Sequence, residues 1–408
     1  MHTAEAATEP GPAGHVIVNT HVHVPPNFSA FETPEAAVAA ASAEGVRVVG
    51  ISNFHDQRVY RRFADAALTA GILPVFGLEF ITVVDDLRDA GIRVNDPGNP
   101  GRMYLCGKGV DPFLEPTENV ARIASAARAD NVARARTMAG LLRDRFAAAG
   151  LATSLDDAAI TADVAERAGV PEAWVVLQER HMAMAFQEAL FLQVPPERRA
   201  LILGRAYGAV PAVPVEDAVA VQGEIRSRLM KAGCHAFVAE SALGFGDAVR
   251  LVLASDGIPA YPTLADGATP VCPFEASPED LAAALKARGI HMAELIPGRN
   301  APGVVDAYVG AFRAAGLAVT AGTEHNTLDA IPFDPACRGG VPVSAAARAV
   351  FWEGTCVVVA HQHLRRAGRP GFVDREGVPA RGFTDDDARI RWFAEIGARV
   401  IAGDGVAS

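Results

Sequence analysis

The sequence has few of the features that mark secreted, membrane-spanning or nucleic-acid-binding proteins. It contains 5 cysteines in 408 residues, an odd number, and no two of them form a C-x-x-C pair. This usage argues against a disulfide framework and favours a reducing compartment, so we expect a cytoplasmic protein. No apolar run approaches the roughly 20 residues of a membrane span. The formal net charge of −11 provides no basic surface for general nucleic-acid binding.

Targeting and common catalytic signatures are also missing. Residues 1–14 are rich in Ala, Glu, Pro and Gly, without a basic segment followed by an apolar one. We therefore expect a flexible tail there and no signal peptide. The chain has no P-loop, no G-x-G-x-x-G after a strand, no G-x-S-x-G and no H-E-x-x-H. The chemistry must be sought in other histidines and carboxylates.

What the sequence does contain is a repeated structural unit. From residue 15 onward, an apolar-periodic helix, a glycine and a short apolar strand follow one another several times. The first predicted helix has Thr33 as N-cap, Pro34 at its first position and Gly45 just past its end. About seven strands separated by helices indicate parallel βα units, and a barrel with insertions can absorb a chain of this length.

The rhythm of the repeat changes in the middle of the chain. Long Ala-, Arg- and Glu-rich stretches with helical spacing dominate residues 113–231, after which strands and helices alternate again. We therefore predict a helical insertion over 113–231 between the βα segments 15–112 and 232–330. Residues 331–408 form a mainly helical C-terminal extension.

The most informative motif is the His-x-His pair formed by His21 and His23. Strand side chains alternate between faces, so the two imidazoles would point the same way, about 7 Å apart, and could share a metal ion. In parallel βα folds, functional groups gather at the carboxyl ends of the strands. The other predicted strand ends carry His55 with Asp56, Glu79, Tyr261, Glu294, and Glu324 with His325.

These motifs resemble those of the PHP superfamily, the polymerase and histidinol phosphatase metallohydrolases. The family's first motif is similar to His21-Val22-His23, and its glycine-x-Glu matches Gly77-Leu78-Glu79. The insertion resembles that of the nucleotide phosphatase and 5′-nuclease branch, in which an element with Arg, His and Ala looks like Arg180-His181-Met182-Ala183. The resemblance covers roughly residues 15–330. It implies a distorted (β/α)7 TIM-like barrel with metal ions at the carboxyl ends of its strands.

Several motifs depart from the family pattern. Ser52-Asn53-Phe54 stands where the family has Thr-Asp-His, and His55 follows one position late. Tyr261 replaces the histidine of Ala-His-Pro, and the closing Gly-Ser-Asp-x-His becomes Gly322-Thr323-Glu324-His325-Asn326. Since a one-residue slip turns a strand side chain to the other face, His55 either replaces the lost ligand through a bulge or caps the next helix together with Asp56.

Each candidate residue also has a purely structural interpretation. His21 and His23 could be a hydrogen-bonded pair at a strand end, and Glu79 could form a salt bridge with an arginine. Tyr261 is favoured as a hydrogen-bonded core phenol over an acid or a donor to substrate. Arg180 could bind an anion bidentately, or it could pair with Glu179 or Glu188.

The C-terminal extension contains a second pair of histidines, His361 and His363. The apolar stretch 344–368 is longer than a strand, so we predict a helix, in which the two side chains diverge by about 200°. A strand would instead make them another His-x-His pair. A further amphipathic helix is predicted over 385–396.

The sequence therefore predicts a metal-dependent hydrolase of a small phosphate ester, such as a nucleotide or a sugar phosphate. Tyr261 and His181 are the candidate catalytic groups. The candidate ligands for one or two Mn, Zn or Fe ions are His21, His23, His55, Glu79, Glu324 and His325. The candidate groups for binding a small anionic substrate are Arg180, His181, Lys231 and Arg299.

Two other functions remain open. One is a mononuclear metal enzyme that acts on a non-phosphorylated sugar acid or a similar molecule. The other is a catalytically inactive relative that binds a ligand or assembles with a partner. No membrane partner is expected, and a homo-oligomer is compatible with the sequence.

Overall fold

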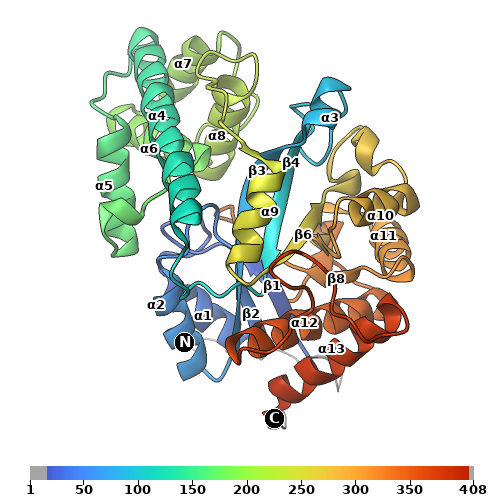
Figure 1. Cartoon of the computed structure of the whole chain (residues 1–408). Helices are drawn as coiled ribbons and strands as arrows, with labels where there is room; N and C mark the ends of the chain where they lie inside the picture. Colours follow the sequence, from blue (N-terminus) through green and yellow to red (C-terminus); the bar gives the residue numbers. More distant parts are fainter. Residues whose placement is uncertain (1–15, 404–408) are drawn as a thin grey trace, which may run out of the picture.

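The computed structural model describes residues 16–403, so the tail predicted over 1–14 lies outside the described residues. Seven strands form a nearly closed, barrel-like sheet (Figure 1). In sheet order they are β1 (Val18–Val22), β2 (Val48–Ile51), β3 (Leu73–Val83), β4 (Arg102–Lys108), β6 (Ile258–Thr263), β7 (Met292–Leu295) and β8 (Ala318–Ala321). The short β5 (Leu243–Gly244) pairs with the end of β3. The two edge strands of this sheet are β1 and β8. Just beyond them, the amide of His23 donates to the carbonyl of Glu324 over 2.7 Å, which links the two edges.

The barrel departs from a regular (β/α)7 pattern at β4. This strand runs antiparallel to both β3 and β6, whereas the other neighbouring strands of the barrel are parallel. The chain reverses directly after β3, through the short helix α3 (Asp85–Asp89), instead of crossing over through a long helix. As a result β4 enters the barrel from the opposite direction, and its last residue, Lys108, is paired with Gly77 and Ile258.

Helices cover the outside of the barrel. They are α1 (Pro34–Ala43), α2 (Tyr60–Thr69), α9 (Phe245–Ala254), α10 (Pro278–Ala287) and α11 (Pro302–Ala314). The helix start predicted at Thr33 is present: its side chain accepts a hydrogen bond from the amide of Ala36, with Pro34 in the first turn. Apolar side chains of these helices pack against the strands in two clusters, one under α1 and α2 and one under α9 to α11.

The middle of the chain is helical and packs largely on itself. It consists of α4 (Glu118–Ala149), α5 (Asp157–Ala168), α6 (Glu179–Gln193), α7 (Pro196–Tyr207), α8 (Ala218–Ile225) and a π-helical turn over Arg226–Met230. Its apolar cluster includes Met138, Phe146 and Phe186 and extends to Ala236. Figure 1 shows these helices in green, beside one end of the barrel. The domain limits taken from the sequence stay a prediction.

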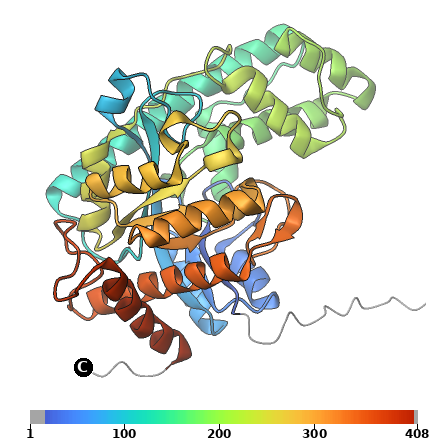
Figure 2. The same ribbon diagram turned by 90° about the vertical axis from the view of Figure 1, so that its right-hand side faces the viewer.

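The C-terminal helices α12 (Ala345–Arg366) and α13 (Asp386–Ala402) close the other end of the barrel (Figure 2). Both helices were predicted, but α13 continues to Ala402, beyond the predicted end at residue 396. They pack against residues at the amino ends of the strands, among them Val48 and Met292. His361 is buried, donates to the carbonyl of Asp256 and accepts from the amide of Phe372, while His363 is exposed. The two histidines therefore do not form a second metal pair.

Within residues 16–403, every helix is too short or too polar to cross a lipid bilayer.

The close approach of α12 to β8 generates a stability prediction. A Cβ atom on Gly354 would lie 1.9 Å from the carbonyl oxygen of Val319, so Gly354→Ala must push the helix away. We expect a loss of about 1–3 kcal/mol in the free energy of unfolding, measured by urea denaturation. Gly310→Ala in α11 is the matched control, because nothing lies within 4 Å of its added Cβ. It should stabilise the protein by up to about 1 kcal/mol. Equal stability of Gly354→Ala and the wild type would contradict this packing.

Candidate functional site

Three potential metal ligands meet inside the barrel mouth. His21 lies near the end of β1, His23 directly follows β1, and Glu79 lies in β3. The Nε2 atoms of the two histidines are 3.3 Å apart, and Nε2 of His23 lies 3.5 Å from Oε2 of Glu79. All three donor atoms lie within 4.8 Å of one another, and all three side chains are almost completely buried.

This arrangement fits a divalent cation. Two nitrogens that each lie about 2.0–2.1 Å from a tetrahedral ion are roughly 3.3–3.4 Å apart, which agrees with the spacing of the imidazoles. Burial, with a smaller contribution from His21, lowers the pKa of His23 well below its usual value, so its ring is neutral and able to coordinate. Burial also raises the pKa of Glu79 to about 7. A bound cation would relieve the unfavourable burial of this carboxylate.

A buried carboxylate orients the first histidine. Nδ1 of His21 donates to Oε2 of Glu294 over 2.7 Å, which leaves the lone pair of Nε2 facing His23. Burial by itself would raise the pKa of Glu294, but Lys108 and His21 together lower it to about 2, so the carboxylate is ionised. His23 has no such support, since its Nδ1 is buried and makes no hydrogen bond within residues 16–403.

The turn after β8 carries Glu324 to the same mouth. Glu324 pairs with Arg299 and accepts a hydrogen bond of 2.6 Å from the side-chain amide of Asn326. His325 turns away: its ring packs against Phe31 and Phe333, its Nδ1 accepts from Thr323, and its Nε2 donates to a backbone carbonyl. Both ring nitrogens are therefore occupied, and the structure does not bring His325 to the other candidate ligands.

His55 also lies apart from the three ligands. Its backbone φ is +59°, and Glu324 and His325 likewise have positive φ values, of +62° and +49°. The backbone at all three residues is therefore left-handed, and the alternation of side chains in a strand does not apply there. The His55 ring packs against Phe54 and Phe80, with centroids 4.1 and 5.3 Å away. The following Asp56 pairs with Arg58 and Arg128 and accepts from the amide of Arg58.

The two candidate catalytic residues, Tyr261 and His181, are structural in this fold. Tyr261 is fully buried and donates to Glu275 over 2.8 Å. Nδ1 of His181 accepts from the backbone amide of Gln178 and caps the start of α6. Neither side chain lines the cavity described below, so we assign neither a role in catalysis or substrate binding.

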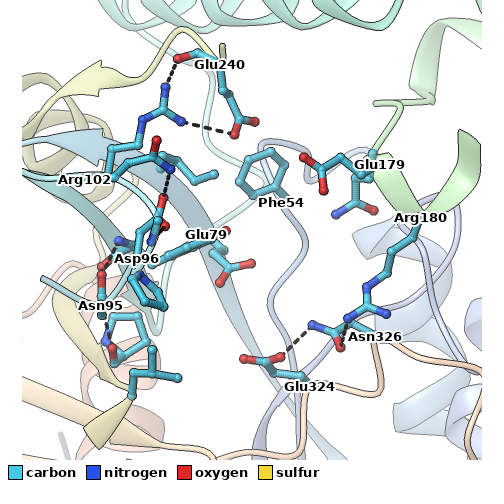
Figure 3. Close-up of a pocket in the computed structure, with 18 of the residues that line it drawn as sticks. Phe54, Glu79, Asn95, Asp96, Arg102, Glu179, Arg180, Glu240, Glu324 and Asn326 are labelled. Atoms are coloured by element: carbon cyan, nitrogen blue, oxygen red, sulfur yellow. Dashed lines mark hydrogen bonds and ion pairs between the residues drawn. The ribbon is translucent and has the colours of Figure 1, made fainter. Parts of the chain in front are cut away.

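A cavity of about 930 Å³ lies between the barrel mouth and the helical insertion (Figure 3). His23, Glu79 and Glu324 line its barrel side, and residues around the start of α6 line the insertion side. Its cationic residues are Arg102, Arg134, Arg180, Arg226, Lys231, Arg299 and Arg338. Its carboxylates are Glu79, Asp96, Glu179, Glu240 and Glu324. The cavity therefore has a cationic excess although the chain is acidic overall, which favours an anionic occupant.

Among the described residues, Arg180 is the cavity cation without a carboxylate partner. The two carboxylates predicted as its partners, Glu179 and Glu188, pair with other residues. Glu179 forms ion pairs with Lys231, Arg134 and Arg226, at 2.6, 3.0 and 3.5 Å, and Glu188 pairs with Arg167. Within residues 16–403, Arg180 has no carboxylate partner, and its one hydrogen bond, of 3.5 Å, goes to Asn326 (Figure 3). Burial, followed by the charge of Arg226, lowers its pKa to about 10, so it stays cationic at neutral pH.

The structure also adds residues that the sequence did not single out. Lys108, Arg134 and Arg226 were not predicted, and Glu294 was noted only as a strand end. The one available signal was Lys108 itself, which directly follows the apolar stretch Met103–Cys106 and a glycine. A lysine in such a position is rarely buried unless it is paired.

Comparison with known proteins supports the fold. No family model matches the sequence, and no curated protein matches it. A proposed metal-dependent phosphoesterase from Bifidobacterium adolescentis is similar in structure, with a TM-score of 0.53, 16% identity and coverage of 83% of this chain and 96% of its own. An amidohydrolase from Chromobacterium violaceum, solved with bound sulfate and no metal, gives a TM-score of 0.51 and 17% identity, and covers 82% and 97%. At these identities the likeness shows the shared α/β barrel-like fold.

The geometry predicts which histidines bind metal. His21→Ala should remove stoichiometric metal, because it deletes one of three converging ligands. His55→Asn should keep the wild-type metal content, and asparagine tolerates the positive φ at this position. Elemental analysis of the desalted, metal-loaded proteins measures both. Loss of metal in His55→Asn would show that His55 is a ligand and would contradict the arrangement described here.

Proposed function

We propose that this protein is a metal-dependent hydrolase whose substrate is a small phosphate ester. The observation that supports the proposal is the opening of the His21, His23 and Glu79 cluster into a cavity with excess cationic side chains. A divalent ion, when bound, supplies Lewis acidity and activates water for attack on the ester. In this proposal His21, His23 and Glu79 hold the ion, and Glu294 keeps His21 oriented.

The remaining residues of the cavity bind and position the substrate. Arg180 has a guanidinium without a carboxylate partner, so it can donate two hydrogen bonds to a phosphate without losing an ion pair. Arg299 forms an ion pair with Glu324, and Lys231 forms one with Glu179. These ion pairs hold the two cationic groups at fixed positions beside the substrate. The sulfate bound to the Chromobacterium violaceum relative is a tetrahedral anion, which agrees with a phosphate-like occupant.

A second candidate is a hydrolase of a non-phosphorylated anion, such as a sugar acid or an amide. Two histidines and one carboxylate are a common ligand set of single-metal hydrolases, which act on substrates other than phosphate esters as well. The amidohydrolase among the structural neighbours points the same way. A ligand-binding protein without turnover is the third outcome to be tested.

A substrate panel separates these functions. The protein is loaded with Mn²⁺, Zn²⁺ or Fe²⁺ and is offered phosphomonoesters alongside their unphosphorylated and amide counterparts. We expect phosphate release from some phosphomonoesters and its loss in the His21→Ala/His23→Ala double variant. Turnover of the unphosphorylated compounds alone supports the second candidate. Binding without turnover under all three metals supports the third. Phosphate release that survives the double variant would refute the metal-dependent mechanism.

Arg180 provides a test of substrate binding. Arg180→Gln removes the cavity guanidinium that has no carboxylate partner within residues 16–403. It should lower kcat/KM for the best phosphomonoester by roughly 10- to 100-fold, because charged hydrogen bonds contribute about 1.5–3 kcal/mol. Most of this loss should appear in KM, and metal content should not change. Arg136→Gln is the matched control, because Arg136 is an exposed α4 residue that pairs with Asp157 outside the cavity. Equal kinetics for the two variants would exclude Arg180 from the substrate site.

A further inference from the structure

Three buried carboxylates converge on the barrel mouth. They are Glu79 in β3, Glu294 in β7 and Glu324 after β8, and they are 9%, 0% and 6% exposed. Ionised carboxylates at such depths are strongly unfavourable unless a cation or several hydrogen bonds compensate them. The identity of each compensating group therefore decides how many metal ions the site can accept.

Glu294 is compensated by Lys108, which is itself only 1% exposed. The ammonium nitrogen lies 2.5 Å from Oε1 of Glu294 and 3.1 Å from the carbonyl oxygen of Thr20. The hydroxyl of Thr20 lies 3.2 Å from Oε1 and 3.0 Å from the carbonyl oxygen of Ala321, so these two acceptors share its proton, and the imidazole of His21 donates to Oε2. Both oxygens of Glu294 are thus occupied by donors from the chain.

Glu324 is compensated in the same way by Arg299 and by the amide of Asn326, and both groups bind its Oε2 atom. Glu79 differs from the other two carboxylates. Within the described part of the chain its only ion-pair partner is the imidazole of His23, at 3.5 Å, and no lysine or arginine pairs with it. Glu79 is therefore the one carboxylate of the three without a permanent cation.

A second group of ligand types exists but is already satisfied. His21, Cys106 and Glu294 offer ligand atoms within 4.8 Å of one another, next to the first group. However, the Nδ1 atom of His21 and both oxygens of Glu294 are engaged in the hydrogen bonds just described, and Lys108 places a positive charge beside them. A second divalent ion would either have to displace the ammonium of Lys108 or be repelled by its positive charge.

We propose that the centre is mononuclear: one divalent ion binds to His21, His23 and Glu79, while Lys108 and Arg299 serve as built-in cations for the other two carboxylates. This inference rests on the proposed function for its choice of a metal, and it specifies the number of ions. Three carboxylates, Lys108 and Arg299 leave a net charge of −1, which one divalent ion turns to +1. The loaded site therefore attracts an anion without a second ion.

The antiparallel direction of β4 is what makes this arrangement available. Because β4 runs antiparallel to its neighbours, its last residue, Lys108, lies beside Ile258, the first residue of β6. From there its ammonium reaches the carbonyl oxygen of Thr20 in β1 and the carboxylate of Glu294 in β7. Lys108 is a positioning residue in this account: it holds Glu294, which in turn holds His21.

Metal stoichiometry tests the inference independently of turnover. The full chain is saturated with Mn²⁺, and bound metal is measured by equilibrium dialysis with elemental analysis and by electron paramagnetic resonance. We expect one ion per chain and the six-line signal of isolated Mn²⁺ for the wild type. Two ions per chain, or a spin-coupled signal, would overturn the proposal.

Two variants and one control examine the role of Lys108. Lys108→Met leaves Glu294 without its cation and should raise the content towards two ions per chain, whereas a content that stays at one would overturn this role. The double variant Lys108→Met/Glu294→Gln restores neutrality, guards against a folding failure of the single variant, and should again bind one ion, with affinity lowered by up to about 100-fold. Zero ions in a folded double variant would show that Glu294 is a ligand.

Lys286→Met is the matched control, because it breaks a lysine–carboxylate pair with Asp386 outside the site and should keep one ion. The outcomes also separate this inference from the proposed function. A protein that binds one ion and hydrolyses no phosphate ester retains the mononuclear centre and loses the function. A protein that binds two ions and hydrolyses the esters retains the function and loses the inference.

Discussion

The site depends on a short chain of buried, hydrogen-bonded groups that runs from Lys108 to Glu294 to His21. Glu294 has no exposed surface, and its ionised carboxylate is stabilised by donors on both oxygens, the ammonium of Lys108 and the imidazole of His21. Its hydrogen bond to Nδ1 fixes the tautomer of His21 and therefore the direction of the Nε2 lone pair. The other potential ligands are arranged around this fixed imidazole, so the site exists only because side chains of β1, β4 and β7 converge inside the barrel.

The cavity adds a second level of organisation. The barrel contributes the candidate ligands and their carboxylates, while the helical insertion contributes Arg134, Arg180, Arg226 and Lys231. Because the insertion has its own apolar cluster, its cationic side chains are carried on a packed unit and not on a flexible loop. Most of these cations neutralise Glu179, and Arg180 is left without an acidic partner. Charge that is fixed before binding can stabilise an anion with little reorganisation.

Sequence reasoning worked where the backbone is regular. The helix starting after Thr33 and the helix over 344–368 follow from caps and apolar periodicity, and the structure contains both. The prediction of side-chain direction was less successful at the turns that follow β2 and β8. Alternation assumes an extended backbone, but His55 and His325 have positive φ, so their side chains point where alternation could not place them. For Tyr261 the favoured interpretation, a hydrogen-bonded core phenol, is confirmed, but its acceptor, Glu275, lies 14 residues later and no local pattern identifies it.

By itself, the sequence determined the α/β character, the helical middle of the chain, the two C-terminal helices and the adjacent placement of His21 and His23, since these depend on periodicity, caps and spacing within a few residues. Only the tertiary structure decided that β4 is antiparallel, that Lys108 neutralises Glu294, and that Glu79 remains the carboxylate without a permanent cation. The physical reason is that burial and charge pairing are set by groups far apart in the sequence, here 186 positions between Lys108 and Glu294 and 273 between His21 and Glu294. Local sequence patterns do not identify such distant partners.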